Sequence, residues 1–370
     1  MPKLFNRYSK GIRHFARLLI PMLLGIVLTC VLAQAVAASS VDSDIVPTIQ
    51  TMTTIVSIYV NPTSGNDANM GTIASPYRTL QKALQIVRSG DTIKLASGVY
   101  QESNKTLTSG TASAPITIEP DDGAKPILDG NLNTLDAIRI LNSFYIIRNL
   151  EIRNAKIGVQ IEGATGVVFE NNNINHISFD GLRLRSSAQG NTIRNNVIWA
   201  TGLAGNFNAE GIYIGTAPEH RYMNGGLPDP CTHNIITGNE IYNVGEGIDI
   251  KEDSSFNTVT GNIIHDCTDP LSGGINVRSD NNYLYNNTSY NNAGAGFRFG
   301  GDITYSPDFG DNYHYGIGNT LRNNIARNNA NAGYKFMNGA QDADISNTGS
   351  GNGSPLYVYG AGVKPFIANP

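Results

Sequence analysis

Cysteine and positive charge are both scarce in this sequence. Of its three cysteines, only Cys231 and Cys267 follow the first 38 residues. The five basic residues before position 38 leave 21 basic and 30 acidic residues in the remainder, a net charge of −9. A chain this acidic is a poor partner for nucleic acid or for an anionic membrane. A polyanionic glycan as ligand would need local positive charge or a bridging cation.

The N-terminal 38 residues have the pattern of an export signal. Five basic residues and no acidic residue stand in the first 17 positions, and an apolar run spans residues 18–32. Small residues between Ala33 and Ala38 then offer A-x-A cleavage sites. We expect residues 1–38 to be a signal peptide, residues 39–55 to be a linker, and the protein to be secreted without a stable membrane span. An uncleaved membrane anchor is the alternative.

An internal repeat decides the fold class. A motif of one small residue, one apolar residue, any residue and a second apolar residue begins at Ala137, Gly158, Gly181, Gly211, Gly247, Gly274, Gly296 and Gly333. The shortest intervals are 21 to 23 residues, enough for three short strands and three turns. Coils stacked at roughly 4.8 Å bury apolar residues that one coil cannot. The repeat therefore predicts an all-β chain, a right-handed parallel β-helix. The missing L-x-x-L-x-L pattern argues against a leucine-rich repeat.

A second motif, Asn-x-apolar-x-x-Asn, recurs between these copies, for example from Asn257 to Asn262. Asparagine tolerates the left-handed conformation and bonds to nearby backbone. We therefore expect these asparagines to occupy equivalent turns and to hydrogen-bond along the axis. Cys231 and Cys267 fall at different positions of the repeat, so no disulfide is expected, although an extracellular location permits one.

The repeat also sets the expected boundaries. The β-helix is predicted over residues 56–340, with three parallel sheets between about Ile93 and Phe336 and a C-terminal cap or tail over residues 341–370. Longer intervals indicate insertions near residues 200–209, 216–233 and 302–318. Insertions in a solenoid cluster around the binding face. The first two flank the strand that starts at Glu210, which predicts a binding site there.

One helix is expected before the repeat begins. Ser75 and Pro76 are typical of an N-cap and a first helical residue, and apolar residues then keep helical spacing up to Gly90. This pattern predicts a helix near residues 77–88. It would cap the open end of the solenoid, where unpaired strand edges are a hazard.

The N-terminal part resembles the opening of secreted bacterial β-helix proteins. The segments that carry this likeness include Tyr59-Val-Asn-Pro-Thr-Ser-Gly-Asn-Asp67, Ser75-Pro-Tyr-Arg-Thr-Leu-Gln-Lys-Ala83 and Gly90-Asp-Thr-Ile93. Many such proteins are pectate lyases, alginate lyases or chondroitinase-B-like lyases. The resemblance covers about residues 56 to 340 and implies the β-helix fold and a polysaccharide as partner.

Two later segments resemble the alginate lyase and chondroitinase B group. Glu246 is followed five residues later by Lys251, and Arg278 stands at the matching place of the next coil. The resemblance implies a metal-binding Glu246, a catalytic Lys251 and an assisting Arg278. The chain departs from the group at Val244, where a second acidic ligand is missing, and at Ser279, which replaces a histidine.

A competing resemblance concerns the next strand. Gly296-Phe-Arg-Phe-Gly-Gly301 is similar to the strand that carries the catalytic lysine of another pectate lyase family. Arg298 stands here in the place of that lysine, so Arg298 is the reserve candidate for the catalytic base.

Spacing alone brings the same residues together. Period-2 geometry points the second and fourth residues after each motif glycine outward, and stacking aligns equivalent positions. Lys251 and Arg278 should then be axial neighbours on one exposed face. We expect three carboxylates beside them, as oxygen ligands for Ca²⁺: Glu210, Glu246 and Asp249. Candidate substrate-binding residues on this face are Tyr213, Asn276 and Arg183. Ordinary solvated ion pairs on a sheet are the competing interpretation.

These residues favour a metal-assisted lyase, a monomer that cleaves an acidic, uronate-containing polysaccharide by β-elimination. A cation neutralises the sugar carboxylate and a side chain removes the neighbouring proton. Two alternatives stay open. One is an inverting glycoside hydrolase, although the Gly-His-Gly and Arg-Ile-Lys motifs of polygalacturonases are absent. The other is a glycan-binding or structural β-helix without catalysis.

Overall fold

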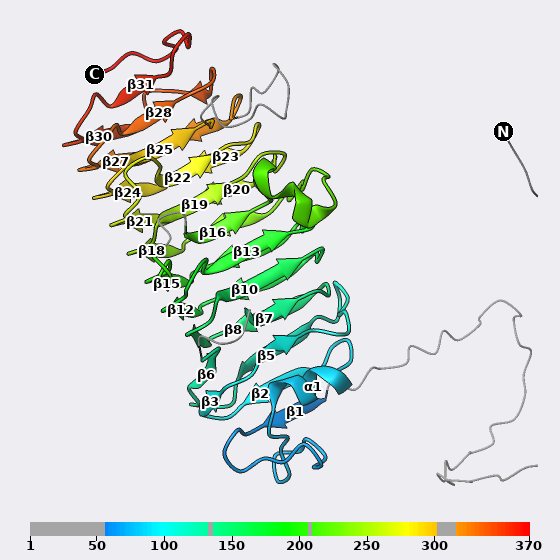
Figure 1. Ribbon diagram of the computed structural model, residues 1–370. Helices are drawn as coiled ribbons and strands as arrows, with labels where there is room; N and C mark the ends of the chain where they lie inside the picture. Colours follow the sequence, from blue (N-terminus) through cyan, green and yellow to red (C-terminus); the bar gives the residue numbers. More distant parts are fainter. Residues whose placement is uncertain (1–55, 132–135, 206–208, 302–315) are drawn as a thin grey trace, which may run out of the picture. The chain divides into compact units, whose positions relative to one another are not determined.

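A computed structural model describes residues 56–131, 136–205, 209–301 and 316–370. The expected signal peptide and linker lie outside the described residues. The described residues form three parallel sheets with 11, 10 and 10 strands (Figure 1). Each complete coil gives one strand to each sheet. The predicted right-handed parallel β-helix is confirmed, and its sheets begin before Ile93 and continue beyond Phe336.

The strands are short and follow one another in strict rotation. The first sheet contains β1 (Ser57–Val60), β2 (Thr92–Leu95), β5 (Ile116–Pro120), β8 (Tyr145–Arg148), β11 (Val168–Glu170), β14 (Thr192–Arg194), β17 (Ile235–Thr237), β20 (Thr258–Thr260), β23 (Tyr283–Tyr285), β26 (Thr320–Arg322) and β29 (Asp342–Ala343). The second contains β4 (Asn104–Lys105), β7 (Asp136–Ile140), β10 (Ile157–Glu162), β13 (Leu182–Arg185), β16 (Glu210–Ile214), β19 (Glu246–Ile250), β22 (Gly273–Val277), β25 (Ala295–Phe299), β28 (Tyr334–Phe336) and β31 (Tyr357–Tyr359). The third contains β3 (Gly98–Tyr100), β6 (Pro126–Asp129), β9 (Glu151–Arg153), β12 (Asn173–Asn175), β15 (Val197–Trp199), β18 (Glu240–Tyr242), β21 (Ile263–His265), β24 (Thr288–Tyr290), β27 (Ile325–Arg327) and β30 (Thr348–Ser350).

The apolar residues of the repeat fill the core. Ile248 and Ile250 of β19 are fully buried, as are their equivalents on the neighbouring coils. The motif glycines let consecutive coils approach closely. A Cβ at Gly247 would lie 2.3 Å from the carbonyl oxygen of Gly274 and 2.4 Å from Ile264, so a larger residue does not fit. This contact explains why the motif begins with a small residue.

Buried asparagines form ladders along the axis, as the second motif predicted. The side-chain amide of Asn234 donates to the Oδ1 of Asn257 at 3.0 Å, and Asn257 donates in turn to Asn282 at 3.2 Å. The expected reason was partly wrong. The left-handed residue is the one before the ladder asparagine, such as Phe256 (φ 61°) before Asn257. The ladder asparagines are buried, and they satisfy turn backbone that would otherwise be unpaired.

The N-terminal helix α1 (Leu80–Ile86) is shorter than predicted and starts later. Its N-cap is Thr79, whose hydroxyl accepts the Lys82 N–H, and the expected N-cap Ser75 lies in a preceding turn. The Glu102 carboxylate accepts the N–H groups of Leu80 and Gln81, which fixes the start of the helix. The buried face of α1 packs against the first coils at the N-terminal end of the solenoid (Figure 1). No helix in the described residues is long and apolar enough to cross a membrane.

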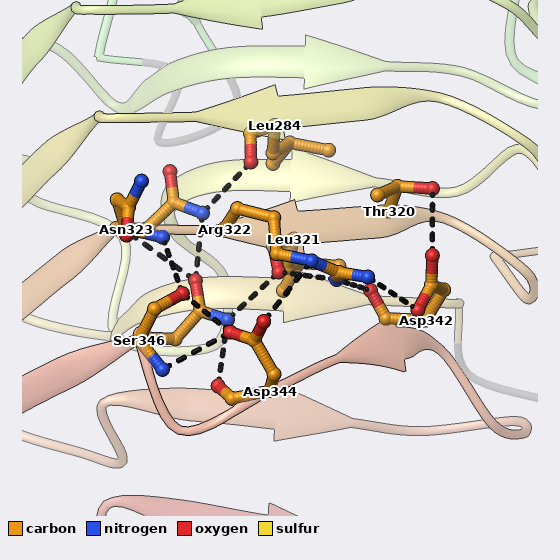
Figure 2. Close-up of polar contacts among 10 residues, drawn as sticks. Leu284, Thr320, Leu321, Arg322, Asn323, Asp342, Asp344 and Ser346 are labelled. Carbon is orange, nitrogen blue, oxygen red and sulfur yellow. Dashed lines mark hydrogen bonds and ion pairs between the residues drawn. The ribbon is translucent and has the colours of Figure 1, made fainter.

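The C-terminal end is closed by a further coil and a short tail. Arg322 of β26 lies between two carboxylates of the last coil, 2.7 Å from Asp342 and 3.1 Å from Asp344 (Figure 2). The tail then turns back over the core, where Ile367 is buried and Asn369 accepts the Tyr357 N–H at 2.7 Å. Cys231 and Cys267 are both buried, and neither forms a disulfide in this structure.

Candidate active site

A groove with a volume of about 590 Å³ runs over the second sheet, between Asp136 on β7 and Arg298 on β25. The insertion after β16 forms part of its wall. It contains the short 3₁₀ helix η1 (Pro218–Asn224), which gives Glu219, His220 and Met223 to the lining. Arg221 forms an ion pair with Asp253 after β19 and anchors η1 to the next coil. The predicted insertion at 216–233 therefore borders the binding face. Most of the insertion at 302–318 lies outside the described residues.

The strand register brings the predicted residues together. Glu210 is paired with Glu246, and Tyr213 is paired with Asp249, between β16 and β19. The Lys251 N–H donates to the Ile214 carbonyl, and on the next coil the Arg278 N–H donates to the Ile250 carbonyl. Lys251 and Arg278 are therefore equivalent positions of adjacent coils, as predicted.

The expectation that this face is exposed was wrong. The side chains of Glu210 and Lys251 are only 3% and 6% exposed. The Lys251 Nζ donates to the Oε1 of Glu210 at 2.7 Å and to a carboxylate oxygen of Asp249. Each outward side chain is covered by its neighbours on adjacent coils. The interpretation of solvated surface ion pairs does not fit this cluster.

Tyr213 lies between two cations rather than offering a free stacking face. Arg183, from the coil before, lies 5.5 Å from the ring centroid, and Lys251, from the coil after, lies 4.5 Å from it. The Tyr213 hydroxyl accepts the Ala217 N–H at 3.0 Å. Tyr213 still lines the groove, so its predicted role in substrate binding stays a prediction. Arg183 also pairs with Asp180.

Two other candidates differ in their access to the groove. Asn276 is 1% exposed and does not line the groove; its amide donates to Glu246 at 2.8 Å, so it holds a carboxylate of the cluster. Arg278 does line the groove, and it lies 3.7 Å from both Asp249 and Glu252. These distances are too long for hydrogen bonds, so its donors can turn to a ligand. Arg298, the reserve base, lines the same groove one coil further on.

The cluster holds fewer charges than its residues suggest. Burial and the charge of Asp249 raise the pKa of Glu246 to about 8, and burial also raises the pKa of Glu210 well above its usual range. Burial opposes ionisation of Asp249 too, but Lys251 and Arg278 outweigh it and lower the pKa of Asp249 to about 2. Burial and Arg278 disfavour the Lys251 ammonium, but Asp249 and Glu210 outweigh them and raise its pKa. At neutral pH the site contains an ionised Asp249, two cations and at least one protonated carboxyl group.

The three carboxylates also fit a metal ion by chemistry. Oxygen atoms of Glu210, Glu246 and Asp249 all lie within 4.8 Å of one another. The Asp249 Oδ1 is buried and accepts no hydrogen bond from a nitrogen of the site. Ca²⁺ takes oxygen ligands of this type. The Lys251 ammonium donates to two of the three carboxylates, so it competes with a metal for the same charge.

Spacing did not reveal three residues of the site. Glu252 is buried and lies beside Arg278, but it follows the end of β19, where strand alternation no longer applies. Asp180 accepts the Glu210 N–H at 3.1 Å, and only its place before a motif glycine hinted at the site. Met223 belongs to an insertion without a repeat, and no sequence signal placed it in the groove.

Two family models match the chain. Residues 58–212 match a Pel9A-like right-handed beta helix region, and residues 206–369 match a general right-handed beta helix region. Together they span the coils and the site. The chain is a right-handed parallel β-helix protein that resembles polysaccharide lyases.

Comparisons with individual proteins show the same resemblance to polysaccharide lyases. Pectate lyase PEL9 of Emericella nidulans is 43% identical over 75 residues, which are 20% of this chain but only 18% of that relative. An alginate lyase from Paenibacillus sp. str. FPU-7 superposes with a TM-score of 0.66 at 22% identity, over 84% of this chain and 99% of the lyase. Pectate lyase Pel9A superposes with a TM-score of 0.60 at 16% identity, over 84% of this chain and 78% of that lyase. At these identities the superpositions show a shared fold.

Proposed function

We propose that this protein is an exported polysaccharide lyase, carried out of the cell by residues 1–38, that cleaves a uronate-containing polysaccharide by β-elimination. The observation that carries the proposal is the cluster of Lys251, Tyr213 and Arg278 in the floor of a groove on a β-helix. The solved lyases that share the fold support the same reaction class. In this reaction the proton at C5 leaves, the C4–O bond breaks and a C4–C5 double bond forms. The departing oxygen takes up a proton, and no water is consumed.

Lys251 is the proposed base. It is a buried amine that lines the groove, and its position directly after β19 places Nζ beside Glu210 and the ring of Tyr213. It carries a proton in the free site, so that proton must leave before Lys251 can act. Glu210 is the acceptor at hand, because its Oε1 lies 2.7 Å from Nζ. The neutral amine then takes the C5 proton.

Arg278 is proposed to hold the sugar carboxylate. Glu252 and Asp249 outweigh the effect of burial and hold the pKa of Arg278 well above its usual range, so it is a poor proton donor. A guanidinium whose ion pairs are as long as 3.7 Å keeps donors for a bidentate contact with a carboxylate. This contact lowers the charge on the uronate and makes its C5 proton easier to remove.

Tyr213 is the proposed proton donor to the leaving oxygen. Burial raises its pKa to about 12, so it is protonated at every working pH. Its hydroxyl accepts one hydrogen bond from the Ala217 N–H, which leaves its own proton for the substrate. Phenol is a stronger acid than guanidinium. Tyr213 is therefore the better proton donor of the two, and Arg278 keeps the role of binding the sugar carboxylate.

Ca²⁺ is part of the proposal as a second way to neutralise the carboxylate of the sugar. Bound at Glu210, Glu246 and Asp249, it would supply positive charge toward the sugar carboxylate. Lys251 would then lose its contacts to two carboxylates, which favours its neutral form.

An inverting hydrolase fits the cluster less well. One carboxylate oxygen from each of Glu210, Glu246 and Asp249 lies within 4.8 Å of the other two. An inverting hydrolase needs two carboxyl groups roughly 6.5 to 9.5 Å apart, with a water between them.

The deciding experiment incubates purified protein with pectate, alginate, chondroitin and dermatan. New ultraviolet absorbance together with new reducing ends identifies the unsaturated product of a lyase. Reducing ends without absorbance would identify a hydrolase. Retention on a polymer with neither signal would identify a binding protein.

A further inference from the structure

Arg185, at the end of β13, is a cation of the groove that is held by neutral groups. It lines the groove and is half-buried. Its Nε donates to the Thr216 hydroxyl at 3.1 Å, and both terminal nitrogens lie 3.6 Å from the Met223 sulfur. It forms no ion pair with any residue that the structure describes. Its charge is therefore held in the wall with only neutral partners.

The paired cations nearby make the contrast clear. Arg183, two residues earlier, is bound to Asp180, and Arg139 of β7 is bound to Glu162 at 2.5 Å. An arginine offers five N–H donors in a planar fork that matches a carboxylate. In Arg185 one donor meets a hydroxyl and two meet a thioether, which is a weak acceptor. Strong donors thus remain for a ligand.

The position of Arg185 along the groove fits a neighbouring sugar unit. The Gly215 N–H donates to the Leu184 carbonyl, so Gly215 is the equivalent of Arg185 on the next coil, and Lys251 follows on the coil after. Two coils correspond to roughly 10 Å along the axis. The intervening position is Gly215, which has no side chain. At this distance from Lys251, Arg185 is too far away to bind the carboxylate of the sugar at Lys251. It can instead bind the carboxylate of a neighbouring sugar of the polymer.

We propose that Arg185 binds the carboxylate of a second uronate, adjacent to the one that is cleaved, and so makes the enzyme select for consecutive acidic sugars. The inference rests on the proposed lyase function and extends it to the substrate's sequence. The insertion after β16 takes part, because Thr216 and Met223 set the direction of the guanidinium. Arg185 is a binding residue, and Lys251 and Tyr213 remain the reacting groups.

The test compares Arg185→Met with the wild type on uronate oligosaccharides of increasing length. Arg194→Met is the matched control, because Arg194 is exposed on the first sheet, outside the groove, and pairs with Glu170. We expect Arg185→Met to raise KM tenfold or more for oligosaccharides that reach the second site. The shortest cleavable one should keep its KM, and kcat should be unchanged throughout. Arg194→Met should match the wild type.

An unchanged KM at every length, or an equal rise at every length, would overturn the inference while leaving the lyase function intact. If the wild type cleaves no uronate polymer, the proposed function fails. Affinity electrophoresis with the same polymers then tests whether Arg185 binds a carboxylate. Loss of retention in Arg185→Met but not in Arg194→Met supports a carboxylate site there. Equal retention in both variants, or no retention of the wild type, rejects it.

Discussion

The Nζ of Lys251 lies 2.7 Å from the Oε1 of Glu210, across the boundary between two coils of the β-helix. The two residues are 41 positions apart in the sequence, and an insertion that forms one wall of the groove lies between them. The contact links the base of the proposed reaction to the group that takes its proton. Lys251 therefore stabilises the fold in addition to its proposed role in the reaction.

Replacement of Lys251 should therefore damage both activity and stability. We expect Lys251→Met to abolish turnover. It should also lower the free energy of unfolding by about 3 kcal/mol or more, because it leaves buried carboxylates without their ammonium. Urea denaturation measures the loss of stability, and product absorbance measures the loss of turnover. A substitution on an exposed face would instead change stability by only about 0.5 kcal/mol.

The double variant Lys251→Met/Glu210→Gln is the control for this prediction. It removes one of the carboxylates left without a partner, so its stability should recover toward that of the wild type while it stays inactive. If turnover survives in Lys251→Met and disappears in Arg298→Ala, the base is Arg298 of β25 and not Lys251.

Tyr213→Phe tests the proton donor. The ring keeps its place between Arg183 and Lys251, but the acidic proton is gone. We expect kcat to fall by roughly 10²- to 10⁴-fold. The Ala217 N–H loses its acceptor, which costs about 1 to 2 kcal/mol of stability. Tyr242→Phe, on the third sheet, should leave both quantities unchanged. Wild-type kcat in Tyr213→Phe would return the role of acid to another residue.

Calcium should compete with the Lys251 ammonium. In protein stripped by a chelator, Ca²⁺ should raise the melting temperature by mass action. Asp249→Asn should weaken the response, because it removes one of the three carboxylate ligands. Lys251→Met should strengthen it, because the competing ammonium is gone. Melting curves that Ca²⁺ leaves unmoved in both the wild type and Lys251→Met would reject a calcium site.

The pH dependence of stability follows in part from Glu246, and Glu210, whose pKa is also raised, acts in the same direction. The pKa of Glu246 rises from 4.5 in the unfolded chain to about 8 in the fold. A group with a raised pKa binds its proton more tightly when folded, so the stabilisation is present at low pH and lost as pH rises toward 8. Asp249, with a pKa of about 2, acts only under more acidic conditions.

We therefore expect the free energy of unfolding to fall by a few kcal/mol between about pH 5 and pH 8. The decline should be shallower in Glu246→Gln, whose amide does not titrate. Urea unfolding across this range measures both proteins. Parallel curves for the two would show that Glu246 is not the group that titrates.

Much of this architecture could be predicted because one glycine repeat sets both period and register. The spacing of Gly211, Gly247 and Gly274 places Lys251 beside Arg278, and the alternation of apolar residues gives the core. Alternation gives the direction of a side chain but not what covers it. The burial of Lys251 depends on Glu210, Asp249 and neighbouring coils, and so it was missed.

Other features depend on contacts that no local pattern contains. The start of α1 is set by Glu102 and by Asp67, which accepts the N–H groups of Arg78 and Thr79, and not by the Ser75-Pro76 pair. The setting of Arg185 depends on Met223, which lies 38 positions away in an insertion without periodicity. The repeat predicts the β-helix fold, whereas the insertions and strand ends determine the surroundings of the site residues.

The most direct test of the account is the course of the reaction in water labelled with heavy oxygen. The wild type is incubated with the uronate polymer that it cleaves, while absorbance is followed and the products are weighed by mass spectrometry. β-Elimination at Lys251 and Tyr213 predicts products that absorb in the ultraviolet and carry no oxygen from water. Products without absorbance that have gained the heavy oxygen would show hydrolysis and contradict the account.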